Sequence, residues 1–233
     1  MRIKEKVESI KERIADAQLR SGNKSPIKIV AITKAHPASL IVEAWRGGLD
    51  TIGENRVQEA EDKFFKITEI LPKITKRLVG HLQSNKINKA LNIFDTIDSV
   101  DSLKLAGKIG RKAVSLNRTI PVLLEVNTSG ESTKFGFTAN DIDEMLACFE
   151  IQGIELRGLM TVGPLTSDKK RIRDAFNNLR ELHNSLKSQL TDNVAKFTEL
   201  SMGMSSDFEI AVEEGATMVR LGTVLFGQRI AKG

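Results

Sequence analysis

Lys34 is the residue whose position in this 233-residue chain most clearly points to chemistry. It closes the apolar run 27–34 (IKIVAITK), so an ammonium group stands at the end of what should be a buried strand. An amine at the rim of a pocket is partly desolvated, and desolvation favours the neutral, nucleophilic form at about pH 7. We therefore interpret Lys34 as a candidate nucleophile; the alternative is an ordinary solvated lysine at a strand end.

Two segments near the C-terminus could bind an anion. ELSMGMSSD (199–207) and VRLGTVLFG (219–227) each place glycine beside Ser or Thr directly after an apolar run. Backbone N–H groups in such turns can approach an anion closely, and the hydroxyl groups add donors. Either segment alone is also typical of a tight turn, but the two together favour a phosphate site.

A phosphate site combined with a reactive lysine suggests pyridoxal 5′-phosphate (PLP), held as a Schiff base. Arg220 fits this interpretation, because it lies two residues before Gly222 and its side chain should point to the same side of the strand. The guanidinium group could then meet the pyridine nitrogen while the backbone of Gly222 and Thr223 holds the phosphate.

The elements that must position these residues follow an alternating pattern. Short apolar runs predict strands at 27–34, 51–55, 77–82, 96–100, 120–127, 154–162, 197–203 and 217–223. Helical patterns lie between them at 38–47, 56–70, 84–93, 101–116, 138–150, 168–190 and 206–214. The last of these has a capping-box pattern from Ser206 to Glu209 and a terminating Gly215.

Eight alternating strand and helix units predict an α/β fold, a closed (β/α)8 TIM barrel, with an open doubly wound sheet as the alternative. An extra amphipathic helix at 1–22 precedes the barrel at 27–227, and residues 1–233 read as one domain. In a parallel barrel the C-terminal strand ends share one face, where ligands bind. The residues at these ends are mostly polar or glycine, as expected of a ligand pocket.

Composition excludes several other classes of function. The net charge of +5 comes from basic residues scattered among acids, which does not favour nucleic-acid binding. One cysteine, Cys148, and three separated histidines predict neither a disulfide framework nor a metal site. A single cysteine and the lack of a signal-peptide pattern or a long apolar run predict a cytoplasmic protein that does not enter membranes.

The whole series of motifs resembles a known family. AITKAHP, GENRVQEA, LVGHLQSNK, IDSVDS, LLEVNTSGESTKFGF, RGLMTVGP and LSMGMSSDFEIAVEEGATMVRLGTVLFG occur in this order between about residue 27 and Gly227. Together they resemble the pyridoxal phosphate homeostasis proteins, formerly described as proline synthetase co-transcribed homologues. That family is similar to the N-terminal barrel of alanine racemase without its β-rich second domain.

The resemblance implies a set of cofactor-binding residues. Lys34 would form the Schiff base with PLP, and Arg220 would face the pyridine nitrogen. The phosphate would be held by Ser201, Gly222 and Thr223, with Met202 and Gly203 lining the same end. Asn55 and His81 would lie near the cofactor ring. One departure is the pair Ala35-His36, where many relatives carry Thr directly after the lysine.

The function implied is binding and homeostasis of PLP rather than robust catalysis. Racemisation by two bases needs a second acid–base group, which in alanine racemase is a tyrosine from the other domain, and this chain contains no tyrosine. An arginine at the pyridine nitrogen also disfavours protonation there and weakens the ring as an electron sink. We therefore expect a monomer that buffers PLP or delivers it to apo PLP-dependent enzymes. Two alternatives are a weak amino-acid racemase, with His81 as a stand-in base, and a barrel for another phosphorylated ligand.

Overall fold

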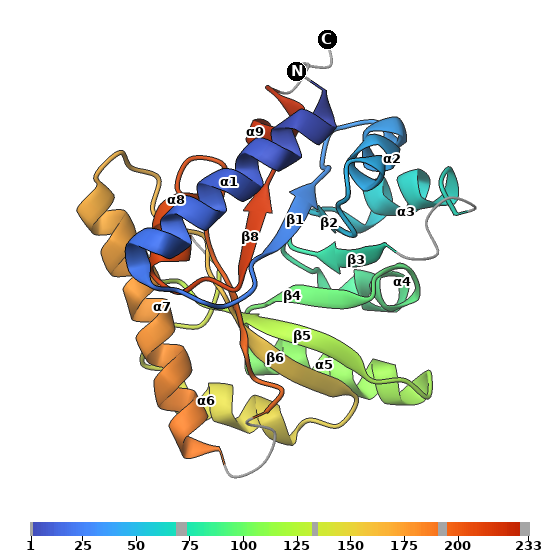
Figure 1. Ribbon diagram of the computed structural model, residues 1–233. Coiled ribbons are helices and arrows are strands. Elements are labelled where there is room, and N and C mark those ends of the chain that lie inside the picture. The colour runs from blue at the N-terminus through green and yellow to red at the C-terminus, as the bar shows by residue number, and fades with distance from the viewer. Residues whose placement is uncertain (1, 69–73, 132–134, 191–194, 229–233) are drawn as a thin grey trace.

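Eight parallel strands close into a barrel in the order of the chain (Figure 1). The computed structural model describes residues 2–68, 74–131, 135–190 and 195–228. The strands are β1 Lys28–Ile32, β2 Thr51–Glu54, β3 Thr75–Leu78, β4 Thr96–Val100, β5 Ile120–Glu125, β6 Ile154–Met160, β7 Glu199–Ser201 and β8 Met218–Leu221. Because β1 pairs with β8 as well as with β2, the sheet has no edge. The predicted barrel is confirmed, and the open sheet is wrong.

Helices surround the barrel and connect consecutive strands. They are α1 Ile3–Ser21, α2 Ala38–Arg46, α3 Val57–Phe65, α4 Ile87–Ile93, α5 Leu103–Ser115, α6 Ile142–Ala147, α7 Lys169–Gln189, α8 Phe208–Glu213 and α9 Thr223–Phe226. Two 3-10 turns, η1 Ser84–Lys86 and η2 Cys148–Glu150, adjoin α4 and α6. Of the helices that the structure describes, none is long and apolar enough to cross a membrane.

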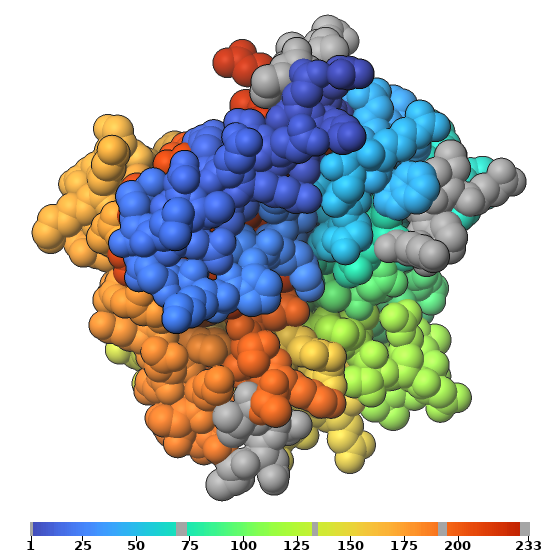
Figure 2. Space-filling model, in the orientation of Figure 1, coloured from blue at the N-terminus to red at the C-terminus, as the bar shows by residue number. Residues whose placement is uncertain are grey.

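The additional helix α1 is attached to the outside of the barrel. Its buried stripe of Val7, Ile10, Ile14 and Ala17 follows the helical period predicted from the sequence, so one face packs against neighbouring helices. It lies against α2, α8 and α9 (Figure 1), and Figure 2 shows its other face, in dark blue, forming part of the molecular surface. Ion pairs between arginines of α1 and glutamates of α8 add to this contact: Arg13–Glu209 at 2.6 Å and Arg20–Glu213 at 2.7 Å.

Several predicted boundaries differ from the structure for local reasons. The capping box at Ser206 is wrong, because the N-cap position of α8 is Asp207, one residue later, and the carboxylate of Asp207 accepts from the Met204 N–H at 2.5 Å. The helix predicted at 138–150 begins only at Ile142, because Thr138 and Asp141 form a side-chain-bonded turn. Strands β1 and β3 end at Ile32 and Leu78, earlier than predicted, so the residues that follow them lie in loops.

Charged side chains are buried inside the barrel, which the apolar pattern did not predict. Arg77 of β3 is 3% exposed, and its Nε lies 2.7 Å from the carboxylate of Asp98, which is fully buried. Its Nη2 lies 2.7 Å from Glu199 at the start of β7. Burial of a charge is costly unless it is paired and hydrogen-bonded, and Arg77 satisfies both carboxylates. This triad therefore ties β3, β4 and β7 together across the barrel.

Candidate functional site

A cavity of about 760 Å³ opens at the C-terminal ends of the strands. This volume is in the range of sites that bind small molecules. The side chains around it come from loops and strand ends far apart in the sequence: Ile32, Lys34, Asn55, Val79, Val162, Met204, Ser205, Ser206, Arg220, Gly222, Thr223 and Val224. Five of the nine predicted site residues are thus brought together, namely Lys34, Asn55, Arg220, Gly222 and Thr223.

Lys34 lies in a turn and not in the strand itself. The strand β1 ends at Ile32, and the N–H of His36 donates to the carbonyl of Thr33 at 3.0 Å, which closes a four-residue turn. The half-buried side chain of Lys34 lines the cavity from the first of the two central positions of this turn. A lysine at the end of the apolar run is tolerated because it leaves the strand before its ammonium group would be buried in the sheet.

Arg220 is a buried cation held on one side and open to the cavity on the other. Its Nη1 donates to the carbonyl and the hydroxyl of Ser201 at 2.7 and 2.8 Å, and its Nη2 donates to the carbonyl of Thr161 at 2.6 Å. A guanidinium has five N–H donors, so two remain for a ligand. Burial lowers the pKa of Arg220, and three nearby carboxylates oppose this effect: Asp98, Glu125 and Asp207. The group stays charged, since arginine is not deprotonated in proteins.

The cavity also contains a point where backbone donors converge. The hydroxyl oxygen of Ser205 accepts from the N–H groups of Gly222 at 3.3 Å and Val224 at 3.2 Å. Thr223 lies between these amides and lines the cavity. The two N–H groups thus point at the Ser205 oxygen, and an anion that took the place of this oxygen would meet both amides, with the residues Ser206 and Thr223 in the same lining.

Ser201, Met202 and Gly203 do not line the cavity. Ser201 is fully buried and accepts a hydrogen bond from Arg220, so it orients that side chain. Met202 is fully buried in the core. Gly203 has φ +91°, and a Cβ there would lie 2.5 Å from the Cβ of Ala211, so glycine is required by packing against α8. Their predicted contact with a phosphate stays a prediction.

The sequence did not identify residues 204–206 as part of the cavity lining, although they belong to the motif that predicted the anion site. The motif SMGMSSD contains three serines, and its sequence alone does not distinguish them. The bend after β7 decides that Ser205 and Ser206 line the cavity and that Ser201 does not. The pairing of the Ser205 hydroxyl with amides of the last βα turn has no signature in sequence, because it joins segments from two different strand ends.

His81 stands at the rim, outside the cavity lining. It follows β3 by three residues, and its side chain is 39% exposed. Its Nδ1 lies 2.8 Å from a carboxylate oxygen of Asp101, and its ring stacks on Phe135 with 4.2 Å between the ring centroids. Both interactions hold the imidazole at the rim, so its predicted position near the cofactor ring stays a prediction. Asn55 directly follows β2 and lines the cavity.

Glu125 is an ionisable group at the end of β5 that the sequence did not single out. Burial raises its pKa to about 7, and Asp101 adds to this effect while Arg220 opposes it. The folded state therefore favours the neutral carboxyl. The stabilising contribution of Glu125 is complete below the unfolded-state pKa and is lost as the pH rises through about 7.

Glu125→Gln should remove this pH dependence. As the pH rises from 4.5 to 8, the unfolding free energy of wild type should fall by up to about 3 kcal/mol relative to that of the variant. Each unit of pKa shift corresponds to about 1.4 kcal/mol. Urea unfolding of the apo protein at a series of pH values measures the difference. Parallel curves for the two proteins would show that Glu125 ionises normally.

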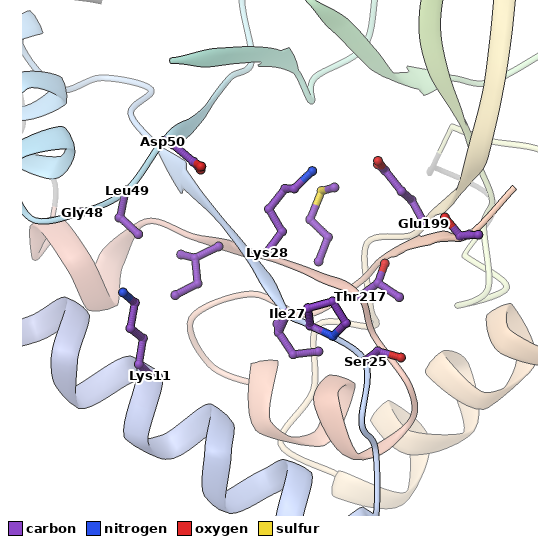
Figure 3. A pocket seen from close by; sticks show the side chains of 13 residues that line it. Lys11, Ser25, Ile27, Lys28, Gly48, Leu49, Asp50, Glu199 and Thr217 are labelled. Atoms are coloured by element: carbon purple, nitrogen blue, oxygen red, sulfur yellow. The ribbon is translucent and has the colours of Figure 1, made fainter. Parts of the chain in front are cut away.

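A second cavity, of about 570 Å³, lies at the opposite end of the barrel (Figure 3). Lys11 reaches into it from α1 and Lys28 from β1. Its acidic residues, Asp50 and Glu199, equal the lysines in number, and Glu199 is already paired with Arg77. This cavity therefore has no net preference for an anion, and it lies away from the catalytic face of parallel barrels.

The described residues do not include a group of three His, Cys, Asp or Glu side chains that could hold a metal ion.

Comparison with known proteins agrees with this geometry. The family model for the N-terminal domain of alanine racemase matches residues 6–230. A pyridoxal phosphate homeostasis protein of Aquifex aeolicus is 37% identical over 227 residues, which cover 97% of both chains. PipY of Synechococcus elongatus, solved with PLP bound, is 37% identical with a TM-score of 0.84 and covers 97% of this chain and 100% of that one. An alanine racemase of Clostridium difficile shares the fold, with a TM-score of 0.74 and 19% identity over 93% of this chain and 55% of that chain.

Proposed function

The chain belongs to the pyridoxal phosphate homeostasis proteins, within the family of alanine racemase N-terminal domains, and from this membership we propose that it binds PLP and serves PLP homeostasis. One observation carries the proposal: a single cavity contains a lysine, a buried arginine with two unused N–H donors, and a group of converging backbone and hydroxyl donors. These three features match the aldehyde, the pyridine nitrogen and the phosphate of PLP.

The residues present fit this cofactor. When bound, PLP supplies an aldehyde that takes up an amine and a ring that withdraws electrons. Lys34 would hold the cofactor at its aldehyde through its neutral amine. Arg220 would donate to the pyridine nitrogen, and the phosphate would lie among Ser205, Thr223 and the neighbouring amides. The predicted roles of Asn55 and His81 beside the ring are part of the same proposal.

The protein would hold and release PLP without turning over amino acids. Arg220 would keep its charge beside the pyridine nitrogen, which would disfavour protonation of that nitrogen and weaken the ring as an electron sink. The sequence has no tyrosine to act as a second base, and the described contacts of His81 hold it at the rim. Apo PLP-dependent enzymes are the proposed recipients. A monomeric, single-domain protein in the cytoplasm, with the buried thiol of Cys148 kept reduced, fits this role.

Hydrogen exchange distinguishes the carrier from a racemase. We expect the holo protein, mixed with alanine or serine in deuterated water, to exchange the Cα hydrogen far more slowly than about once per second, the lower range of enzyme turnover. The same protein should transfer PLP to an apo-enzyme, measured against free PLP at the concentration that the protein releases. Exchange at enzymatic rates would replace the carrier with the racemase, and His81→Ala would then test the second base.

The phosphate is expected to supply much of the affinity. Thr223→Ala should weaken PLP binding about tenfold to a hundredfold, because a hydrogen bond to a charged group contributes about 1.5–3 kcal/mol. Binding of pyridoxal, which lacks the phosphate, should change little. Fluorescence titration of both ligands measures the two effects, and equal losses for both would place the phosphate elsewhere.

A further inference from the structure

We propose that Glu54, Glu59 and Lys63 form a partly buried clamp that holds the turn of Lys34 in a strained conformation and so aims its amine into the cavity. This inference rests on the proposed function, because it concerns how Lys34 reacts with an aldehyde. The three clamp residues come from the end of β2 and from α3, and none of them lines the cavity. They would be positioning residues that act through Lys34.

The turn has a conformation that its own sequence does not favour. Lys34 and Ala35 are its two central residues, and Ala35 has φ +62°. A residue with a Cβ is disfavoured in this left-handed region, which glycine occupies freely. Such a conformation persists only where the surrounding structure enforces it, and it is found preferentially at functional sites.

The clamp grips the turn on both sides of Lys34. On the N-terminal side, the hydroxyl of Thr33 donates to Glu54 Oε1 at 2.5 Å, and the carbonyl of Thr33 accepts from Lys63 Nζ at 2.6 Å. On the C-terminal side, the N–H of Ala35 donates to Glu59 Oε1 at 2.5 Å. Both neighbours of Lys34 are thereby fixed, and Lys34 between them lines the cavity.

Lys63 connects the two carboxylates into one unit. Its Nζ lies 2.8 Å from Glu54 Oε1 and 2.7 Å from Glu59 Oε1. The Glu54 side chain is fully buried and that of Lys63 is 10% exposed, so the pair is shielded from water. Burial raises the pKa of Glu54, and the hydrogen bonds from Lys63 and Thr33 oppose this effect. Hydrogen bonds in such surroundings are strong and geometrically demanding, which suits them to hold a strained turn.

The arrangement has a direct consequence for reactivity. Attack on an aldehyde needs the amine within a narrow range of distance and direction, and a displacement of about 1 Å can cost about a hundredfold in rate. A lysine has four flexible side-chain bonds, so its reach depends on where its Cα is fixed. The clamp fixes that Cα from both sides without occupying the space of the ligand.

Glu59 provides the first test, because its side chain is 28% exposed and its replacement should leave the protein folded. Glu59→Ala removes the acceptor for the Ala35 N–H, and Glu59→Gln keeps one. We expect Glu59→Ala to slow formation of the borohydride-reducible adduct between apo protein and PLP by about tenfold to a hundredfold. Glu59→Gln should recover most of the rate. Stopped-flow absorbance measures the covalent step, and reduction followed by mass spectrometry assigns it to Lys34.

Lys63 provides the second test. Lys63→Met leaves Glu54 buried without its cation, whereas Lys63→Arg keeps a donor for Thr33 and both carboxylates. We expect the Met variant to slow the covalent step at least as much as Glu59→Ala, and the Arg variant to recover part of the rate. Lys89→Met is the matched control, since Lys89 pairs with Glu61 on the exposed side of α3 and α4. If Lys63→Met does not fold, the two Glu59 variants decide the question alone.

A measurement on the apo protein separates positioning from general stability. The rate at which a small aldehyde with borohydride labels Lys34, followed against pH, reports the reactivity of the amine without the phosphate site. The clamp predicts that Glu59→Ala lowers this rate while the melting temperature stays close to that of Glu59→Gln. Unchanged rates in Glu59→Ala, for PLP and for the small aldehyde alike, would overturn the clamp. No adduct at Lys34 in wild type would instead overturn the proposed function.

Discussion

Lys34→Ala is expected to abolish the borohydride-reducible adduct with PLP completely. Among the described residues around the cavity, Lys34 is the only lysine, so no other amine is in position to replace it. The donors of Ser205, Thr223 and Arg220 are unaffected by the substitution, so the variant should still retain PLP noncovalently. Its visible absorbance should be that of the free aldehyde and should not respond to borohydride as a Schiff base does.

Mass spectrometry of the reduced wild-type protein should locate the label on Lys34. Lys86 is the appropriate control, because it is half-buried in η1, close after β3 in the chain, but does not line the cavity. Lys86→Ala should therefore form the adduct at the wild-type rate. A label found mainly on Lys86 or Lys63 would refute the assignment and would place the cofactor elsewhere in the barrel.

The architecture and the position of Lys34 could be predicted because they depend on local patterns. Each predicted strand contains or overlaps one strand of the structure, and parallel strands place their C-terminal ends at one face. That rule alone brings Lys34, Asn55 and Arg220 together, although nearly two hundred residues separate the first from the last. Periodicity and topology are therefore sufficient for this part of the site.

The remaining parts depend on how loops bend and on contacts between distant segments. Ser201 and Ser205 are identical residues in one motif. The bend after β7 buries Ser201 against Arg220 and places Ser205 in the lining of the cavity. The pattern of β3 likewise gave no sign that Arg77 would meet Asp98 inside the barrel. The raised pKa of Glu125 depends on burial, which a single strand-end glutamate does not reveal in sequence.

Arg220 connects the stability of the barrel with its chemistry. Its guanidinium donates to the carbonyl and the hydroxyl of Ser201 in β7 and to the carbonyl of Thr161 after β6, and its charge lies near the buried carboxyl groups of Glu125 and Asp207. A residue in this position cannot be optimised for the ligand alone. The weak electron sink proposed for the cofactor is, on this view, a consequence of a cation that the fold itself requires.

Arg220→Met is therefore expected to destabilise the apo protein by about 3 kcal/mol or more at pH 8, because the buried carbonyls of Ser201 and Thr161 lose their donor and each buried acceptor left without one costs about 1–3 kcal/mol. The loss should shrink as the pH falls towards 5, because burial raises the pKa of both Glu125 and Asp207 and they protonate first. Urea unfolding at the two pH values measures this, together with the loss of PLP affinity.

Arg20→Met is the matched control for that experiment, since Arg20 pairs with Glu213 at 2.7 Å on the surface and is 52% exposed. An exposed pair of this kind contributes about 0–1 kcal/mol, so its removal should cost little at either pH. If Arg220→Met were as stable as Arg20→Met at pH 8, the guanidinium would not be compensating the buried carboxylates. Its charge beside the pyridine nitrogen would then have to be explained by the ligand alone.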